Sequence, residues 1–180
     1  MTRPLIAVAA VSLVTMLSAC STMGTMSMAK PEAPAAVSVP AGNKVAMMAV
    51  GAGDLTYECR VKASMPGAFE WVFAGPNALL LDKNKATVGK YYAGPTWESN
   101  DGSKVTGKQL AVAPGAAGAI PLQLVQASPA MGSGAMTGVT YIQRLNTVGG
   151  VAPADGCDQA GVGSKKLVKY QADYYFYKAI

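Results

Sequence analysis

The feature that most constrains the fold is an alternation of apolar and polar residues with a period of two. In residues 55–62, Leu-Thr-Tyr-Glu-Cys-Arg-Val-Lys, every second side chain is apolar and the side chains between them are polar or charged. Successive side chains of a β-strand point to opposite faces of the sheet. The pattern therefore predicts a strand with one buried and one solvated face.

Comparable strand patterns recur along the chain and are separated by turns rich in glycine, proline, asparagine or aspartate. The expected strands lie at residues 55–62, 69–73, 79–81, 87–92, 105–112, 120–124, 139–146 and 167–177. No segment has a sustained helical period. Many short strands with frequent turns predict an all-β fold, an antiparallel β-sandwich or barrel of about eight strands.

The N-terminal residues are typical of an export signal. Arg3 precedes an apolar run at residues 5–16, which is too short for a good membrane-spanning helix. The run ends in Leu-Ser-Ala-Cys at residues 17–20, which resembles the lipobox of bacterial lipoproteins. We expect cleavage before Cys20 and a lipid on its thiol; the alternative is an ordinary signal peptide, cut after Ala19, that releases the protein. Ser21, in place of an aspartate, favours the outer membrane.

The chain is expected to divide into a signal peptide (1–19), a lipidated cysteine with a flexible tether (20–44) and a single β domain (45–180). The tether contains small residues, methionines and three prolines. Such a composition buries too little apolar surface to offset the entropy of ordering, which predicts a spacer between the lipid and the domain.

Three cysteines are present, and lipidation of Cys20 leaves Cys59 and Cys157. In an oxidising compartment the simplest expectation is a disulfide between them. Two free thiols, or a metal pair without further ligands, are the alternatives. A disulfide would fasten the irregular connection around Cys157 to the strand that carries Cys59.

Charge and composition disfavour several functions. The chain has no histidine, which removes the commonest general base and metal ligand and argues against hydrolytic or metal catalysis. We expect no metal site and no cofactor. The net charge is +5, but the basic residues are scattered, whereas a nucleic-acid-binding protein usually carries a basic stripe. We therefore expect no nucleic-acid partner.

Candidate binding residues gather at residues 91–103, which mix aromatic, acidic and turn-forming side chains. Tyr91, Tyr92 and Trp97 could stack on a sugar or another flat ligand, or bury in the core. Glu98 and Asp101 could form a catalytic carboxylate pair. Alternatively, Asp101 stabilises the turn and Glu98 pairs with a lysine or a backbone amide.

Arg144 is the remaining candidate. Its planar guanidinium suits an anionic ligand. The alternative is an ion pair with Glu58 or Glu98 within the sheet.

Several ordered motifs resemble an uncharacterised family of exported bacterial and secreted fungal proteins. They lie at residues 53–60, 71–73, 92–98, 101–103, 142–150, 156–158 and 172–177. The resemblance implies a secreted β-rich domain with paired cysteines over about residues 45–177, and it implies no activity. Members often have a histidine near position 90 and an aromatic residue after Ile-Pro, where this chain has Lys90 and Leu122.

These observations support one leading hypothesis and two alternatives. The first is a lipid-anchored protein of the bacterial cell envelope that faces the periplasm and binds an envelope glycan, a peptide or a protein partner. The second is a small hydrolase or lyase that uses Glu98, Asp101 and a tyrosine on envelope glycans. The third is a purely structural envelope protein.

Overall fold

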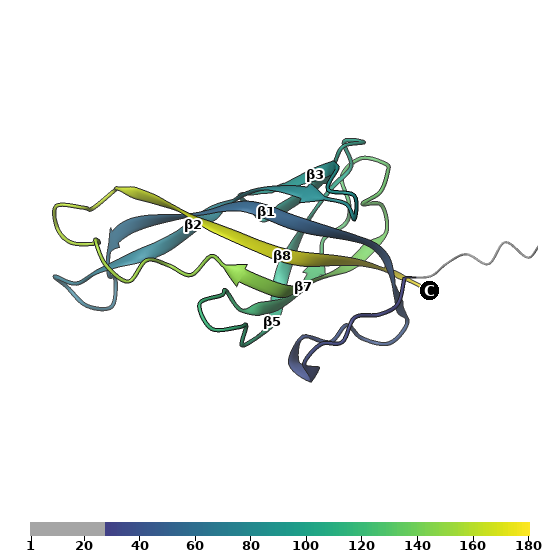
Figure 1. Cartoon of the computed structure of the whole chain (residues 1–180), viewed down its shortest axis with the longest axis horizontal. Helices are drawn as coiled ribbons and strands as arrows, with labels where there is room; N and C mark the ends of the chain where they lie inside the picture. The colour runs from purple at the N-terminus through teal and green to yellow at the C-terminus, as the bar shows by residue number, and fades with distance from the viewer. Residues whose placement is uncertain (1–27) are drawn as a thin grey trace, which may run out of the picture.

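The computed structural model describes residues 28–180, which form a closed barrel of antiparallel strands (Figure 1). Each strand pairs with the next along the chain, and the last strand returns to pair with the first. The elements are a short 3₁₀ helix η1 (Ala35–Val37) and the strands β1 (Asn43–Val61), β2 (Phe69–Leu81), β3 (Thr87–Tyr92), β4 (Thr96–Ser99), β5 (Lys104–Ala113), β6 (Leu122–Ala127), β7 (Val139–Gly149) and β8 (Lys165–Ala179).

The all-β prediction is confirmed, and the architecture is the barrel. The alternation in β1 has the expected effect, because Leu55, Tyr57 and Cys59 are buried while Arg60 is exposed. In β8, within the strand expected at 167–177, every second residue from Tyr170 to Phe176 is also buried.

The structure has the expected number of eight strands, but two of them differ from the predicted ones. The sequence predicts separate strands at 69–73 and 79–81, but β2 runs through both without a break. Gly75 has a φ of 153° and lies opposite a register shift at Thr56 and Tyr57, so Pro76 sits beside a bulge in the ladder. The missing strand is β4, within the segment expected to be an irregular corner.

The interior of the barrel holds the main core, which is unusually aromatic. Tyr91, Trp97, Tyr174 and Phe176 are all buried in it. A second, smaller cluster lies outside the barrel wall, where Val37 and Val39 cover part of β5–β8. The part of the outer face that they cover is therefore also buried.

The N-terminal segment differs from the expected tether. From Met28 onward it lies against the barrel: Met28 bridges to Val45, and the Gln143 side chain donates a 2.7 Å hydrogen bond to the Val37 carbonyl. Residues 28–44 are thus part of the folded body and are not a free spacer. The signal peptide, the lipobox and Cys20 lie outside the described residues. Within residues 28–180, no helix is long and apolar enough to cross a membrane.

The two ends of the barrel differ. At one end, here called the closed end, lie the chain termini of the folded body and the β2–β3, β4–β5 and β6–β7 connections. The fully buried Met136 of the β6–β7 connection packs into the core there. At the other, open end, β1, β2 and β8 extend well beyond the remaining strands (Figure 1).

Candidate functional site

A cavity opens into the barrel at the open end. Two overlapping cavities, of about 300 and 200 Å³, share five lining residues: Phe73, Tyr91, Gln109, Gln123 and Arg144. The cavity rim includes Gly94 and Pro95 of the β3–β4 turn and Pro121 just before β6. The shared lining makes this one site with two lobes.

One wall of the cavity is aromatic and comes from β1–β4. Tyr91 and Trp97 face each other across the β3–β4 pairing and stack with ring centroids 4.6 Å apart. The Trp97 ring also meets Tyr174 edge to face at 5.9 Å. Phe73 contacts Tyr57 edge to face and is 51% exposed. Tyr91 and Trp97 therefore form a rigid floor, and Phe73 is the aromatic ring that an incoming molecule would meet.

The opposite wall is polar and comes from β5–β7. Gln123 pairs in register with Arg144, and its side-chain amide donates to the Gln109 side-chain carbonyl. Arg144 donates to the Pro121 carbonyl through Nε at 3.2 Å and Nη2 at 2.9 Å. The expected ion pair of Arg144 with Glu58 or Glu98 is wrong, because Arg144 faces the cavity and both glutamates have other partners.

Buried tyrosine hydroxyls lie beneath these walls. Burial raises the pKa of Tyr91, Tyr170 and Tyr174 above the ordinary value, and the nearby Arg144 guanidinium opposes this rise only in part. The hydroxyls of Tyr170 and Tyr174 lie 3.3 Å apart. These groups remain neutral at physiological pH, so Arg144 supplies the positive charge of the cavity.

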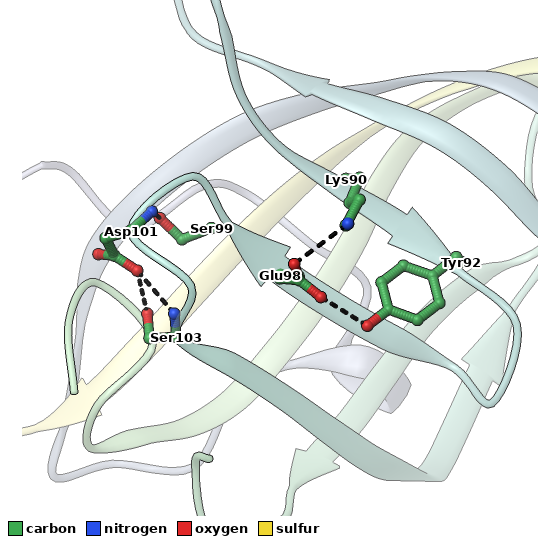
Figure 2. A network of polar contacts seen from close by, with 6 residues as sticks. All are labelled: Lys90, Tyr92, Glu98, Ser99, Asp101 and Ser103. Carbon is green, nitrogen blue, oxygen red and sulfur yellow. Dashed lines mark hydrogen bonds and ion pairs between the residues drawn. The ribbon is translucent and has the colours of Figure 1, made fainter. Parts of the chain in front are cut away.

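Tyr92 and Glu98 lie on the outer face of the barrel (Figure 2). Tyr91 and Trp97, their neighbours along β3 and β4, point into the inner core. Glu98 accepts a 2.6 Å hydrogen bond from the Tyr92 hydroxyl and pairs with Lys90 at 3.1 Å. The Tyr92 hydrogen bond, assisted by Lys90, lowers the pKa of Glu98. Glu98 is therefore an ionised surface carboxylate with two partners.

Asp101 lies in the β4–β5 turn, at the closed end. It accepts hydrogen bonds from the Ser103 hydroxyl and amide (Figure 2) and from the Ala135 amide at 2.7 Å. These hydrogen bonds, that of the Ser103 hydroxyl first, lower the pKa of Asp101 to about 2. The Ser103 hydroxyl in turn accepts from the Met136 amide. Asp101 thus joins the β4–β5 turn to the connection that closes the barrel.

The six predicted binding residues therefore form three separate groups. Tyr91, Trp97 and Arg144 line the cavity, whereas Tyr92 and Glu98 lie outside the wall and Asp101 lies in a turn. Both carboxylates have partners and lowered pKa values, while a general acid in a carboxylate pair needs a raised one. The arrangement matches the structural alternative stated for Glu98 and Asp101.

The disulfide prediction is confirmed: Cys59 and Cys157 are bonded, with their Cα atoms 5.3 Å apart. The bond holds the β7–β8 connection against the extension of β1 and β2. Two more contacts fasten the same connection, because Tyr57 donates to the Gly150 carbonyl at 2.7 Å and Trp71 donates to the Asp155 carbonyl at 3.0 Å. This connection therefore borders the open end in a fixed position.

Sequence reasoning missed three cavity residues, Phe73, Gln109 and Gln123. Phe73 ends the expected strand at residues 69–73, and no motif singles out the two glutamines. The signal that could have found them is Gln123, a polar residue on the same face of its strand as the apolar Val125, which is buried. Within the described chain, no three cysteine, aspartate or glutamate side chains come together in a way that would hold a metal ion.

Comparison with known proteins identifies the family. The family model described as "Protein of unknown function (DUF3455)" matches residues 40–178. The chain belongs to this family. No curated protein and no solved structure matches the chain. The DUF3455 match runs from just before β1 to nearly the end of β8, so every strand of the barrel and the whole cavity belong to the family domain.

Proposed function

We propose that this DUF3455 protein is a lipid-anchored cell-envelope protein that binds a small ligand in the cavity at the open end of its barrel. The observation that carries the proposal is the cavity itself, where an aromatic wall faces a polar wall across about 300 Å³. Ligand sites commonly combine an apolar lining with a few convergent polar groups, and this volume lies at the lower end of their range.

The polar groups of the cavity support a binding role. Arg144 reaches the cavity from β7, and Gln109 and Gln123 lie beside it. The indole N–H of Trp97 is buried and has no hydrogen-bond partner among residues 28–180. Unsatisfied buried donors cost free energy, so structures retain few of them unless they serve a purpose. A ligand in the cavity would offer an acceptor to the N–H groups of Arg144.

The position of the tether supports an orientation. Met28 bridges to Val45, near the closed end, and only residues 21–27 separate it from Cys20. A chain of this length spans at most about 30 Å when fully extended. A lipid on Cys20 would therefore hold the closed end towards the membrane, and the cavity would open away from it into the periplasm. The Ser21 pattern favours the outer membrane.

The geometry favours a small molecule over the glycan or protein partner first considered. A sugar platform needs an exposed aromatic face, but Trp97 is only 1% exposed and Tyr91 and Tyr174 cover it. Phe73 is the aromatic residue of the cavity with a large exposed surface. The carboxylate hydrolase or lyase is less favoured, because Glu98 and Asp101 lie outside the cavity and serve other contacts.

The anchor is tested by Cys20→Ser in the full-length protein. We expect the wild-type protein to partition with membranes and the variant to appear in the soluble periplasmic fraction, because lipid attachment requires the thiol. A variant that still partitions with membranes would contradict lipidation at Cys20.

Ligand binding is tested by thermal shift with a set of small acids, amines, sugars and neutral aromatic compounds. We expect at least one class to raise the melting temperature, since a ligand that binds only the native state stabilises it. Gln123→Trp, which places a large ring in the cavity, should abolish the shift, and Gln126→Trp on the outer side of β6 should not. Shifts that survive Gln123→Trp would place binding elsewhere.

A further inference from the structure

We propose that the cavity recognises organic monocarboxylates, with the carboxylate held by Arg144 and an aromatic or alkyl body against Phe73. This inference rests on the proposed binding function and names its ligand class. It depends on how the structure distributes its charges and on which hydrogen atoms of Arg144 are already used.

The first observation is the contrast between the two arginines of the barrel. Arg60 pairs with Glu58 at 3.2 Å on the surface. Within the described residues, the other ion pairs join Lys62 to Glu70, Lys90 to Glu98 and Lys169 to Asp54. Arg144 has no carboxylate within 4.0 Å in the part of the chain that the structure describes. A partly buried guanidinium without a counter-charge is favourable to anion binding.

The second observation is the direction of the hydrogen bonds of Arg144. The Pro121 carbonyl accepts from Nε and Nη2, so it occupies one edge of the planar guanidinium and fixes its orientation. Neither the hydrogens of Nη1 nor the second Nη2 hydrogen donate to a carbonyl or carboxylate of residues 28–180, and the Tyr174 hydroxyl is the protein group within hydrogen-bonding reach of the guanidinium beside them. One hydrogen of Nη1 and the second hydrogen of Nη2 form the end of the fork, and the spacing of this pair matches the two oxygens of a carboxylate.

The third observation limits the charge of the ligand. The other polar groups of this wall, Gln109 and Gln123, are neutral amides that can donate a hydrogen bond but cannot neutralise a second negative charge. A single guanidinium therefore matches one negative charge, which favours a carboxylate over a phosphate dianion.

The fourth observation concerns the body of the ligand. Beside Arg144, the smaller lobe is lined by Leu55, Ile120 and the exposed ring of Phe73. Apolar and aromatic groups thus lie within the same cavity as the cation. An acid with an aryl or short alkyl chain would place its charge on Arg144 and its apolar part in this lobe.

The test compares carboxylates with neutral partners of nearly the same shape: benzoate with benzamide, 3-phenylpropanoate with 3-phenylpropanamide, and octanoate with octanamide. Binding is measured by calorimetry, and by the fluorescence of Trp97 in a Trp71→Phe background. At least one acid should bind about 10- to 100-fold more tightly than its amide, the range expected for a charge-assisted hydrogen bond.

Three variants assign this preference to Arg144. Arg144→Gln should remove the advantage of the acid over the amide, and Arg144→Lys, which keeps the charge but loses the planar fork, should retain part of it. Arg60→Gln, the same change on the surface, should leave the preference intact. Near-ultraviolet circular dichroism checks that Arg144→Gln keeps its packed aromatic core.

Equal affinities of acids and amides, or an acid preference that survives Arg144→Gln, would overturn the carboxylate inference. So would the failure of every acid to bind below about 1 mM, an affinity of roughly 4 kcal/mol. The proposed binding function would still stand in each case if the broader thermal-shift set gave a ligand that Gln123→Trp blocks. It would fail if that set gave none.

Discussion

The two ends of the barrel use their polar side chains in opposite ways. At the closed end, Asp101 accepts hydrogen bonds from two connections, and the Met136 side chain fills the interior. At the open end, Arg144 has one carbonyl partner and faces a cavity. One end thus satisfies its charged group within the protein, and the other leaves hydrogen-bonding capacity unused.

This difference separates residues that stabilise the fold from residues available to a ligand. A carboxylate that accepts several hydrogen bonds is ionised and held in place, which suits a structural role. A guanidinium beside a cavity, with no carboxylate partner in the described chain, suits recognition. Changes at the closed end should therefore affect stability, whereas changes to the polar wall of the open end should chiefly affect binding.

The largest effect on the free energy of unfolding is expected from removal of the disulfide. Such a loss would show that the open end, too, contains an element that stabilises the fold. The double variant Cys59→Ala/Cys157→Ala should lose about 4–5 kcal/mol of the free energy of unfolding, because the bond closes a loop with a sequence separation of 98 residues. Urea denaturation measures the loss. An unchanged midpoint would show that the contacts of Tyr57 and Trp71 are enough to hold the β7–β8 connection.

The next largest effect is expected for the residue that closes the barrel. Met136→Ala should lower the free energy of unfolding by about 2–5 kcal/mol, since it removes a fully buried side chain and leaves a cavity. Met131→Ala is the control, because this methionine of the same connection is 47% exposed. Equal losses in the two variants would contradict the assignment of Met136 as the side chain that fills this end.

A smaller and pH-dependent effect is expected for Asp101. Its pKa in the folded protein is about 2, below the ordinary 3.8, so its contribution to stability is complete above about pH 4 and is lost as the pH falls towards 2. Asp101→Asn should be less stable than wild type at pH 7, and the difference should shrink on acidification. Urea midpoints at pH 7, 4 and 2.5 test this.

Asp82→Asn is the matched control, because Asp82 accepts hydrogen bonds only within its own β2–β3 turn at the same end. Asp82→Asn should lower the free energy of unfolding less than Asp101→Asn does. A pH-independent difference between Asp101→Asn and wild type would contradict the lowered pKa of Asp101, because asparagine does not titrate and any pH dependence must come from the carboxylate.

The smallest effect is expected for Glu98, on the outer face. Glu98→Gln weakens a surface ion pair and a hydrogen bond, and such exposed pairs contribute little to stability. The melting temperature and the ligand affinity should both stay close to wild type. A large loss of binding would mean that the outer face takes part in the site and that the distinction between the two sides of the wall is wrong.

The sequence was sufficient where a single face of a strand is buried. The period of two in β1 identified its inward row, and the same rule separates Trp97 from its neighbour Glu98, because adjacent residues point to opposite sides. The disulfide followed from counting cysteines. These conclusions needed only the local residue pattern and the small number of possible cysteine pairs.

The rest depended on contacts between distant segments. On β6, Leu122 and Leu124 lie on the outer face beneath the N-terminal segment, whereas Gln123 and Val125 face the interior. The N-terminal segment is rich in small residues and proline and has no sustained period, so nothing in its pattern predicts that it covers a sheet. Likewise, the partner of Arg144 is the carbonyl of Pro121. Residue types do not reveal which backbone carbonyl will accept a hydrogen bond from a distant side chain.

The pairing of β8 with β1 also has a consequence for how the chain acquires its structure. The contacts that complete the ring join Asn43 to Ala179 and Glu58 to Lys165, so they link segments more than 100 residues apart. Contacts between such distant segments make folding slow. A chain that emerges from its N-terminus onwards leaves one edge of its first strand unpaired until the last residues appear, and the cavity is completed only at that moment.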